Sequence, residues 1–249
     1  NSWIETDENG YRGLFTYEDG TWNGLGVSYW RNGNKRSEGL YKDGKNEGYY
    51  KSFHQNGKVE VEGNFVDGKK EGKWPGYYGN GKIRADGNFV NGKLEGKGKV
   101  YYQSGEVAAE VYYVDGKIEG NYVEYYQSGI VKLESTYSKG EEEGKEIWYF
   151  ESGKVETEGN FIEGKKEGKW IGYHESGVVN WEVNYVDGKW YGKGIWYYEN
   201  GILGGEEFFV NGLLDGKQTT YFDNAVNGEV YDEDIYKNGV CVEMCEGDE

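Results

Sequence analysis

The sequence contains one proline, one methionine, two cysteines and two histidines among 249 residues, and leucine and alanine are scarce. Because leucine and alanine are among the strongest helix formers, their scarcity argues against a helical bundle. No run of 18 apolar residues is present, so no transmembrane helix is predicted. The two histidines lie far apart in sequence, which makes a Ser–His or Cys–His nucleophilic pair improbable. We therefore predict a protein that is not an enzyme and that uses no cofactor.

The two cysteines, Cys241 and Cys245, lie close to the end of the sequence. Their spacing matches no zinc-binding signature, and both histidines are far from them, so we predict no metal site. A disulfide between them would require the chain to turn, because four residues of extended strand span ~13 Å.

Positive charge is also in short supply, since the formal net charge is −17. Such a field repels the phosphate backbone of nucleic acids and anionic lipid surfaces. Nucleic acid is therefore not expected as a partner, and membrane insertion is not expected either. Basic partners or cations suit the charge better, although the charge alone would also keep an exposed sheet soluble.

Glycine and aromatic residues are abundant, with 43 glycines, 25 tyrosines and 9 tryptophans. The glycines recur every 24 residues without insertion or deletion, which is the signature of a repeat protein. One column of these repeat-structural glycines comprises Gly20, Gly44, Gly68, Gly92, Gly116, Gly140, Gly164, Gly188 and Gly212. A second column runs from Gly24 to Gly216 and a third from Gly33 to Gly201, each with the same spacing.

Each repeat is interpreted as two strands joined by short turns. In residues 33–57, the stretch Asn34–Lys42 is predicted to be one strand and Tyr49–Gln55 the return strand. Residues 43–48 are predicted to form a loop with two glycines, and Asn56–Gly57 a two-residue hairpin turn. Short connections force sequential strands to pair antiparallel. The predicted fold class is all-β, an elongated single-layer antiparallel meander of ~24-residue β-hairpin repeats that forms an open, twisted array.

We predict a single repeat domain over residues 1–249. Residues 1–19 form an N-terminal lead-in, residues 20–222 form the regular repeats, and residues 223–249 form an irregular C-terminal cap, because the glycine register is lost after Phe222.

The unit resembles the MORN-type repeat, specifically its bacterial variant. Residues 59–82 carry the motif best, as Glu62-Gly-Asn-Phe65, Asp67-Gly-Lys-Lys-Glu-Gly-Lys-Trp74, Tyr77-Tyr78 and Asn80-Gly-Lys82. The resemblance implies a curved sheet of stacked hairpins with an aromatic-lined groove. It also implies protein–protein contact, scaffolding and self-association. Bacterial relatives are described as antitoxin-like or cell-surface proteins. Some eukaryotic members have been proposed to bind phosphoinositides, a role that the acidic charge here opposes.

Side chains outside the glycine columns give the candidate sites. His54 and His174 occupy a column that otherwise holds Tyr, Phe or Trp, so we interpret both as aromatic substitutes in a packed ladder. An acidic column that includes Glu62 and Glu158 is interpreted as a structural cross-strand polar ladder. The tryptophans that fall outside the repeat columns are the candidate interaction residues, with extra packing on a thin core as the alternative interpretation. They are Trp22, Trp148, Trp181, Trp190 and Trp196.

The leading functional hypothesis is a non-enzymatic repeat scaffold that mediates protein–protein interaction or self-assembly. An open meander leaves unpaired strand edges, through which dimers or filaments would form. The alternatives are a cell-surface glycan-binding protein, in which exposed aromatic rings stack on sugars, and an antitoxin or immunity-like inhibitor of a basic toxin. Because the sequence begins at Asn1 rather than Met, a secreted or cell-surface location is favoured, with a cytoplasmic location as the alternative.

Overall fold

The computed structural model describes residues 2–6, 12–223 and 229–243. The chain forms two compact units, residues 1–119 and residues 120–249. Every regular element in the described residues is a β-strand, and none of the described residues form a helix that could cross a membrane. The all-β fold class predicted from the sequence is therefore confirmed.

The first unit contains fourteen strands. They are β1 (Ser2–Thr6), β2 (Arg12–Glu18), β3 (Thr21–Tyr29), β4 (Lys35–Lys42), β5 (Lys45–Phe53), β6 (Val59–Val66), β7 (Lys69–Lys73), β8 (Gly76–Tyr77), β9 (Ile83–Asp86), β10 (Asn88–Val90), β11 (Lys93–Leu94), β12 (Gly96–Tyr101), β13 (Val107–Val114) and β14 (Lys117–Ile118).

The second unit contains another fourteen strands. They are β15 (Gly120–Tyr125), β16 (Val131–Ser138), β17 (Glu141–Glu142), β18 (Gly144–Tyr149), β19 (Val155–Ile162), β20 (Lys165–Tyr173), β21 (Val179–Val186), β22 (Lys189–Trp190), β23 (Gly192–Tyr197), β24 (Leu203–Val210), β25 (Leu213–Leu214), β26 (Gly216–Tyr221), β27 (Val230–Lys237) and β28 (Val240–Glu243).

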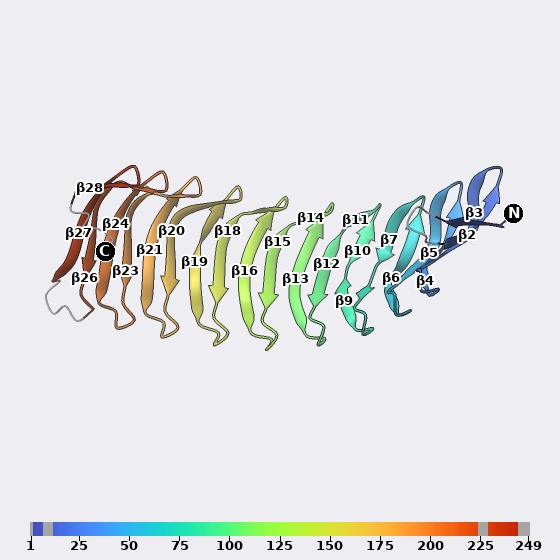
Figure 1. The fold of residues 1–249 in the computed structure, drawn as a ribbon, viewed down its shortest axis with the longest axis horizontal. Coiled ribbons are helices and arrows are strands. Elements are labelled where there is room, and N and C mark those ends of the chain that lie inside the picture. The colour runs from blue at the N-terminus through green and yellow to red at the C-terminus, as the bar shows by residue number, and fades with distance from the viewer. Residues whose placement is uncertain (1, 7–11, 224–228, 244–249) are drawn as a thin grey trace. The chain divides into compact units, whose positions relative to one another are not determined.

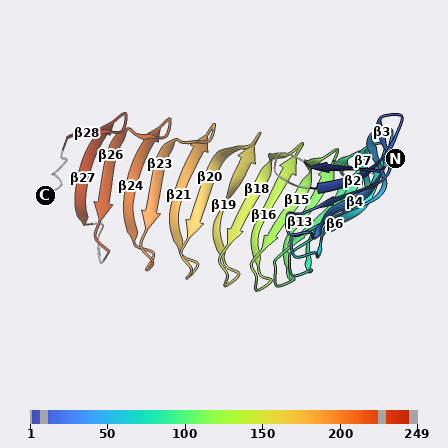
Figure 2. The same cartoon turned by 45° about the vertical axis from the view of Figure 1, so that its right-hand side comes forward.

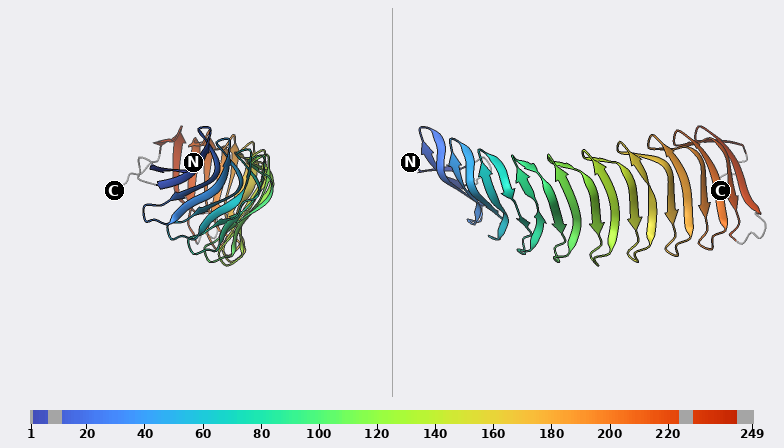
Figure 3. Two further views of the ribbon diagram at one scale, coloured as in Figure 1. Left: turned by 90° about the vertical axis from the view of Figure 1, so that its right-hand side faces the viewer. Right: turned by 180° about the vertical axis from the view of Figure 1, so that it is seen from behind.

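Within each unit the strands pair antiparallel with their neighbours in sequence, as a meander requires (Figure 1). In several repeats the return strand of the hairpin is interrupted and is therefore labelled as two strands. β22 and β23 are one example, and both pair with β21. In the second unit the strands lie side by side in one layer, with no second sheet over either face (Figures 2 and 3). No pairing among the described strands closes either unit, so the predicted open meander is confirmed.

The tight hairpin turns lie at the Asp–Gly positions. Asp43 and Gly44 have φ values of 50° and 79°, and they directly join β4 to β5. Two consecutive residues with positive φ are typical of a type I′ turn, whose twist matches that of the flanking strands. The predicted loop over residues 43–48 is therefore wrong, because the return strand already begins at Lys45.

The Asn–Gly connections are the longer loops, so the predicted two-residue turn at Asn56–Gly57 is also wrong. Residues 54–58 join β5 to β6, and within this loop Gly57 takes a positive φ while Asn56 does not. The Asn56 amide explains the difference, because its Oδ1 accepts a hydrogen bond from the Lys58 N–H at 3.0 Å and its Nδ2 donates to the Gly79 carbonyl at 2.7 Å. Such local bonds stabilise an Asx-type loop.

Both histidines serve as substitutes for tyrosine between neighbouring repeats. His54 Nε2 lies 2.9 Å from the Tyr77 carbonyl oxygen, and His174 Nε2 lies 2.9 Å from that of Tyr197. In the same column, the Tyr126 hydroxyl donates to the carbonyl of the residue 23 positions later. The histidine ring donates the same bond when Nε2 carries the proton. The structural interpretation of this column therefore accounts for both histidines.

The segments at the two ends of the chain contain further strands. The lead-in assigned to residues 1–19 includes β1 and β2, and all of β1 pairs with residues 12–16 of β2. The assigned C-terminal cap includes β27 and β28, joined at Asn238 and Gly239, which both have positive φ as in the regular hairpins. Cys241 lies in β28, and Cys245 lies outside the described residues.

Candidate functional site

Three of the tryptophans singled out from the sequence share one cross-strand row in the second unit. Trp148 on β18 pairs with Thr157, and Thr157 pairs with Gly172 on β20. Gly172 then pairs with Trp181 on β21, and Trp181 pairs with Trp196 on β23. Residues that pair directly across strands point to the same face of a sheet. We call Trp148, Trp181 and Trp196 the tryptophan row.

Glycines on neighbouring strands give these indole rings room. A Cβ built on Gly172 would overlap the Trp181 ring, and one built on Gly205 would overlap the Trp196 ring. The Trp181 indole therefore lies over the backbone of β20, and the Trp196 indole lies over the backbone of β24 on the same face of the sheet. One face of each ring packs on the sheet, and each tryptophan remains half-buried rather than fully covered.

A second aromatic row runs along the same face, nearer the Asp–Gly turns. Trp170 is fully buried, and its ring makes edge contacts with Phe161 at 5.3 Å and Tyr185 at 5.9 Å between centroids. Trp190 continues the row against Phe209 at 4.7 Å, while 40% of its surface stays exposed. This row forms the core of the unit, and Trp190 is at once a packing residue and a surface residue.

The two rows line a groove of about 690 Å³ in the second unit. Its walls include all four off-column tryptophans of this unit together with buried Trp170, and its remaining lining includes Val183 and Phe209. A concave, mostly apolar site with a few polar groups is the usual form of a binding site.

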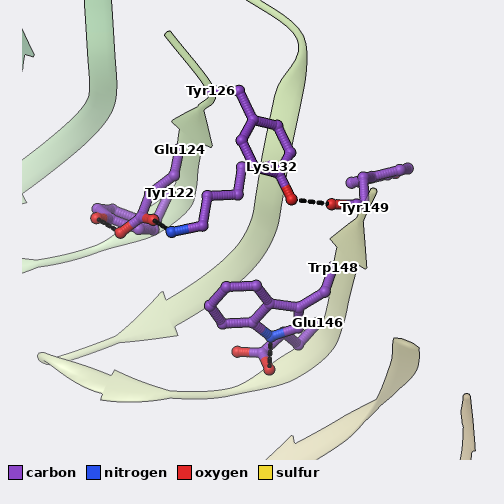
Figure 4. A network of polar contacts seen from close by, with 7 residues as sticks. All are labelled: Tyr122, Glu124, Tyr126, Lys132, Glu146, Trp148 and Tyr149. Atoms are coloured by element: carbon purple, nitrogen blue, oxygen red, sulfur yellow. Dashed lines mark hydrogen bonds and ion pairs between the residues drawn. The ribbon is translucent and has the colours of Figure 1, made fainter. Parts of the chain in front are cut away.

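Polar groups enter the groove as carboxylates. Glu146, on β18, has 5% of its surface exposed, and the Trp148 Nε1–H donates a hydrogen bond to its Oε1 at 2.7 Å. Figure 4 shows this carboxylate beside the Trp148 indole. Burial raises the pKa of Glu146, and the neighbouring charge of Glu142 raises it further. The Trp148 hydrogen bond and the charge of Lys166 act in the opposite direction.

Glu207 is the second carboxylate on this face, at the other end of the groove on β24. Its Oε1 accepts a hydrogen bond from Gln218 Nε2 at 3.0 Å, and burial raises its pKa. Glu156, at the β-bulge between β18 and β19, is a third carboxylate in the lining.

One cation lies on the same lining. The Lys166 ammonium is 3.9 Å from the centre of the Trp170 ring and 5.4 Å from that of Tyr185. A lysine over an aromatic ring is held by a cation–π interaction. The aromatic face of this unit therefore already holds one ammonium group of its own.

The opposite face of the sheet carries the acidic column, paired as a polar ladder. Glu158 accepts a hydrogen bond from the Tyr173 hydroxyl at 2.7 Å and forms an ion pair with Lys145 at 2.8 Å. The Lys145 hydrogen bond lowers the pKa of Glu158, and burial beside this carboxylate raises the pKa of Tyr173 to about 12. In the first unit, Glu62 is bonded in the same way by Tyr77 at 2.8 Å.

Trp22, the fifth candidate, lies in the first unit and not in this groove. Its ring stacks on Phe15 at 4.4 Å, and its Nε1 donates to the Tyr17 hydroxyl at 2.6 Å. It lines a smaller and more polar hollow with Arg36 and Tyr50. These contacts agree with the alternative interpretation of the off-column tryptophans, which was extra packing on a thin core.

The groove carboxylates were not predicted from the sequence, although both depart from the 24-residue columns in which they lie. The positions one repeat before and after Glu146 hold Tyr122 and Trp170. The two positions that precede Glu207 at this spacing hold Val183 and Gly159. Each acid thus interrupts a column of apolar or small residues, and scoring departures from the columns for every residue type would have identified both.

Comparison with known proteins agrees with the repeat architecture. The model of the MORN repeat variant matches seven consecutive segments, residues 22–43, 46–67, 70–91, 94–115, 118–139, 142–163 and 166–187. No curated protein matches the chain.

Two solved structures are similar over most of this chain, the Photorhabdus luminescens Tc holotoxin pore with the mutation TccC3-D651A and the crystal structure of TcdB2-TccC3-TEV. They share 10% identity with it, cover 92% and 93% of it, and have a TM-score of 0.18. The chain spans 16% of the length of each. At that TM-score the similarity supports no conclusion about function. The seven family matches extend over more than half of the sequence, and the chain belongs to the MORN repeat variant family.

Proposed function

We propose that this chain is a non-enzymatic repeat scaffold that binds a protein partner through the aromatic groove of its second unit. The observation that carries the proposal is the tryptophan row, because Trp148, Trp181 and Trp196 lie together on one face and line one groove. Tryptophan is enriched among the residues that dominate the energy of protein interfaces. One repeat after Trp148 the sequence has Gly172, and one repeat after Trp181 it has Gly205, so tryptophan is not a constant feature of the repeat at these positions.

The groups in the groove are suited to binding rather than to catalysis. The carboxylates Glu146 and Glu207 lie on β18 and β24, at opposite ends of the groove. A glycosidase-type pair needs its two carboxyl groups within about 10 Å of each other, and five strand spacings of ~4.8 Å separate the strands of Glu146 and Glu207. This separation supports a role in recognition.

The experiment is capture of a partner from the native source on the immobilised chain. We expect one protein to be retained by the unmodified chain and to be lost with Trp181→Ala or Trp196→Ala. The control is Ile162→Ala, an exposed residue on the opposite face of β19, which should retain the same partner. Equal retention by the tryptophan variants and the control would contradict the proposal.

Self-association is a second candidate function, favoured by the exposed edge at β28. Val240 and Val242 are 64% and 54% exposed on this four-residue strand, whose pairing within the described residues is with β27. Exposed apolar side chains on such a strand favour the addition of another strand.

A further inference from the structure

The aromatic groove carries more negative charge than its lining can neutralise. Glu146, Glu156, Glu182 and Glu207 line it, Glu182 is paired with Lys169, and Lys166 is the cation on the lining. Among the described residues no ion pair includes Glu146 or Glu207, whereas Glu158 and Glu206 on the opposite face are each paired with a lysine. Buried charges are normally paired, so the groove lacks about two positive charges that a partner would supply.

The aromatic rings beside these carboxylates are suited to cations. Lys166 lies over Trp170, and Lys132 lies 5.5 Å from the centre of the Trp148 ring. Among the cation–π contacts of the described residues none involves Trp196, and one face of its indole packs over Gly205. A cation bound there would gain both a ring face and the carboxylate of Glu207 on the next strand.

The positions of Glu146 and Glu207 determine how long a bound peptide must be to reach both carboxylates. Glu146 lies on β18 and Glu207 on β24, and the strands between them pair in the order β18, β19, β20, β21, β23 and β24. Five steps of ~4.8 Å separate the two strands by ~24 Å. An extended peptide rises ~3.3 Å per residue, so about seven residues span that distance.

On these grounds we propose that the groove binds an extended protein segment with two basic side chains eight residues apart, the nearest even spacing that puts both on the same face of the segment, one seated at Glu146 and one at Glu207, and apolar side chains between them against the tryptophan row. The proposal deepens the proposed function and rests on it, because it names the chemistry of the partner that the groove accepts. Charge complementarity selects this occupant over a neutral glycan, which would leave buried Glu146 and half-buried Glu207 without a positive partner.

The test is calorimetric titration of the full chain with synthetic peptides. The probe is a nine-residue peptide with arginine at positions 1 and 9 and apolar residues between them. Matched peptides carry glutamate at both positions, or arginine at positions 1 and 5. We expect the first peptide to bind at least tenfold more tightly than either of the others, because only this peptide places a charge-assisted hydrogen bond at both glutamates.

The variants Glu146→Gln and Glu207→Gln should each weaken binding of the first peptide by about tenfold. The matched control is Glu206→Gln, the adjacent residue on β24, which faces the other way and pairs with Lys193 at 2.5 Å. It should leave the affinity within about twofold of the unmodified chain, and circular dichroism confirms that each variant is folded.

Different results separate the two proposals. If all three peptides bind equally, bind without dependence on either glutamate, and are lost with Trp196→Ala, the groove binds partners but the proposed charge selectivity is wrong. If cellohexaose binds in a manner that needs Trp196 while no peptide binds, both the cationic segment and the protein partner are wrong. Absence of any peptide binding by a folded chain also overturns the inference.

Discussion

At the scale of single residues, glycine decides where an indole lies on this sheet. Gly172 has an ordinary extended backbone, so its importance is spatial, because the Trp181 ring occupies the place of a Cβ. The same arrangement recurs at Gly159 beneath Trp170. Aromatic side chains that cover strand glycines protect the backbone hydrogen bonds there and fill the surface that the glycine leaves empty.

We expect Gly172→Ala to destabilise the chain by ~1–3 kcal/mol, because the added methyl group displaces a packed ring. Urea unfolding measures the change in stability, and the shift of tryptophan emission to longer wavelength reports that Trp181 becomes more exposed. A second variant, Gly172→Ala with Trp181→Leu, should recover part of the loss. Equal destabilisation with and without the tryptophan would contradict the packing argument.

Glu146 provides a prediction about pH. Burial raises its pKa above the value of 4.5 for a free carboxyl, so the folded state binds this proton more readily than the unfolded state. The stability that Glu146 contributes is therefore present below about pH 4.5 and is lost as the pH rises through the folded-state pKa. The charges facing it are Glu142, which adds to the shift, and Lys166, which opposes it.

Glu146→Gln keeps an oxygen that accepts the Trp148 hydrogen bond and removes the titration. We expect this variant to be more stable than the unmodified chain at pH 7.5 and to show little or no advantage at pH 4, as measured by urea unfolding at each pH. Glu206→Gln controls for the change in net charge. A stability difference that is the same at both pH values would be inconsistent with a buried, titrating carboxyl.

At the scale of elements, the hairpin is built from two turn chemistries. Asp–Gly turns join strands directly with both residues at positive φ, whereas Asn–Gly loops use the asparagine side chain to bond their own backbone and the loop of the next repeat. The sequence analysis recognised strands, repeat length and antiparallel order from the columns. It exchanged the two turn types, because Asp–Gly and Asn–Gly are equally typical of tight hairpins and side-chain bonding across repeats cannot be seen in one repeat alone.

Gly44 tests the turn in isolation. Its φ is 79°, and a Cβ at this position would meet no atom within 4 Å. Gly44→Ala should therefore cost ~1–2 kcal/mol of stability, which is the conformational penalty of the left-handed region rather than a clash. Gly44→Asn should cost less, since asparagine visits that region more readily. If thermal unfolding showed Gly44→Asn to be less stable than Gly44→Ala, the positive φ of residue 44 would not be the cause of the loss in stability.

At the scale of the whole molecule, the site could be predicted only in part. The tryptophans were identifiable because they depart from the columns, and four of them line the groove. That three of them form one row depends on the strand register, which follows from the β-bulge in each hairpin. Glu146 and Glu207 also depart from their columns, and they were missed because departures were considered only for the tryptophans.

The edge at β28 gives a prediction for the assembled state. If copies associate through this strand, Val240→Lys with Val242→Lys should abolish association, because charged side chains block strand addition. Light scattering across a hundredfold range of concentration measures the mass. The unmodified chain should grow in mass with concentration and the variant should not. A constant monomer mass for the unmodified chain would exclude this mode of assembly.

The bonds between neighbouring repeats also constrain how such a chain evolves. His54 reaches the carbonyl of Tyr77, and the Glu47 carboxylate accepts a hydrogen bond from the Asp67 N–H, so the partners lie at fixed sequence offsets near one repeat. Gain or loss of a complete 24-residue unit restores every offset, while a shorter insertion breaks the bonds on both sides of it. We therefore expect the length of the repeat array to change by whole repeats. The tryptophan row and its carboxylates would be inherited together, and the number of repeats before and after them would be free to vary.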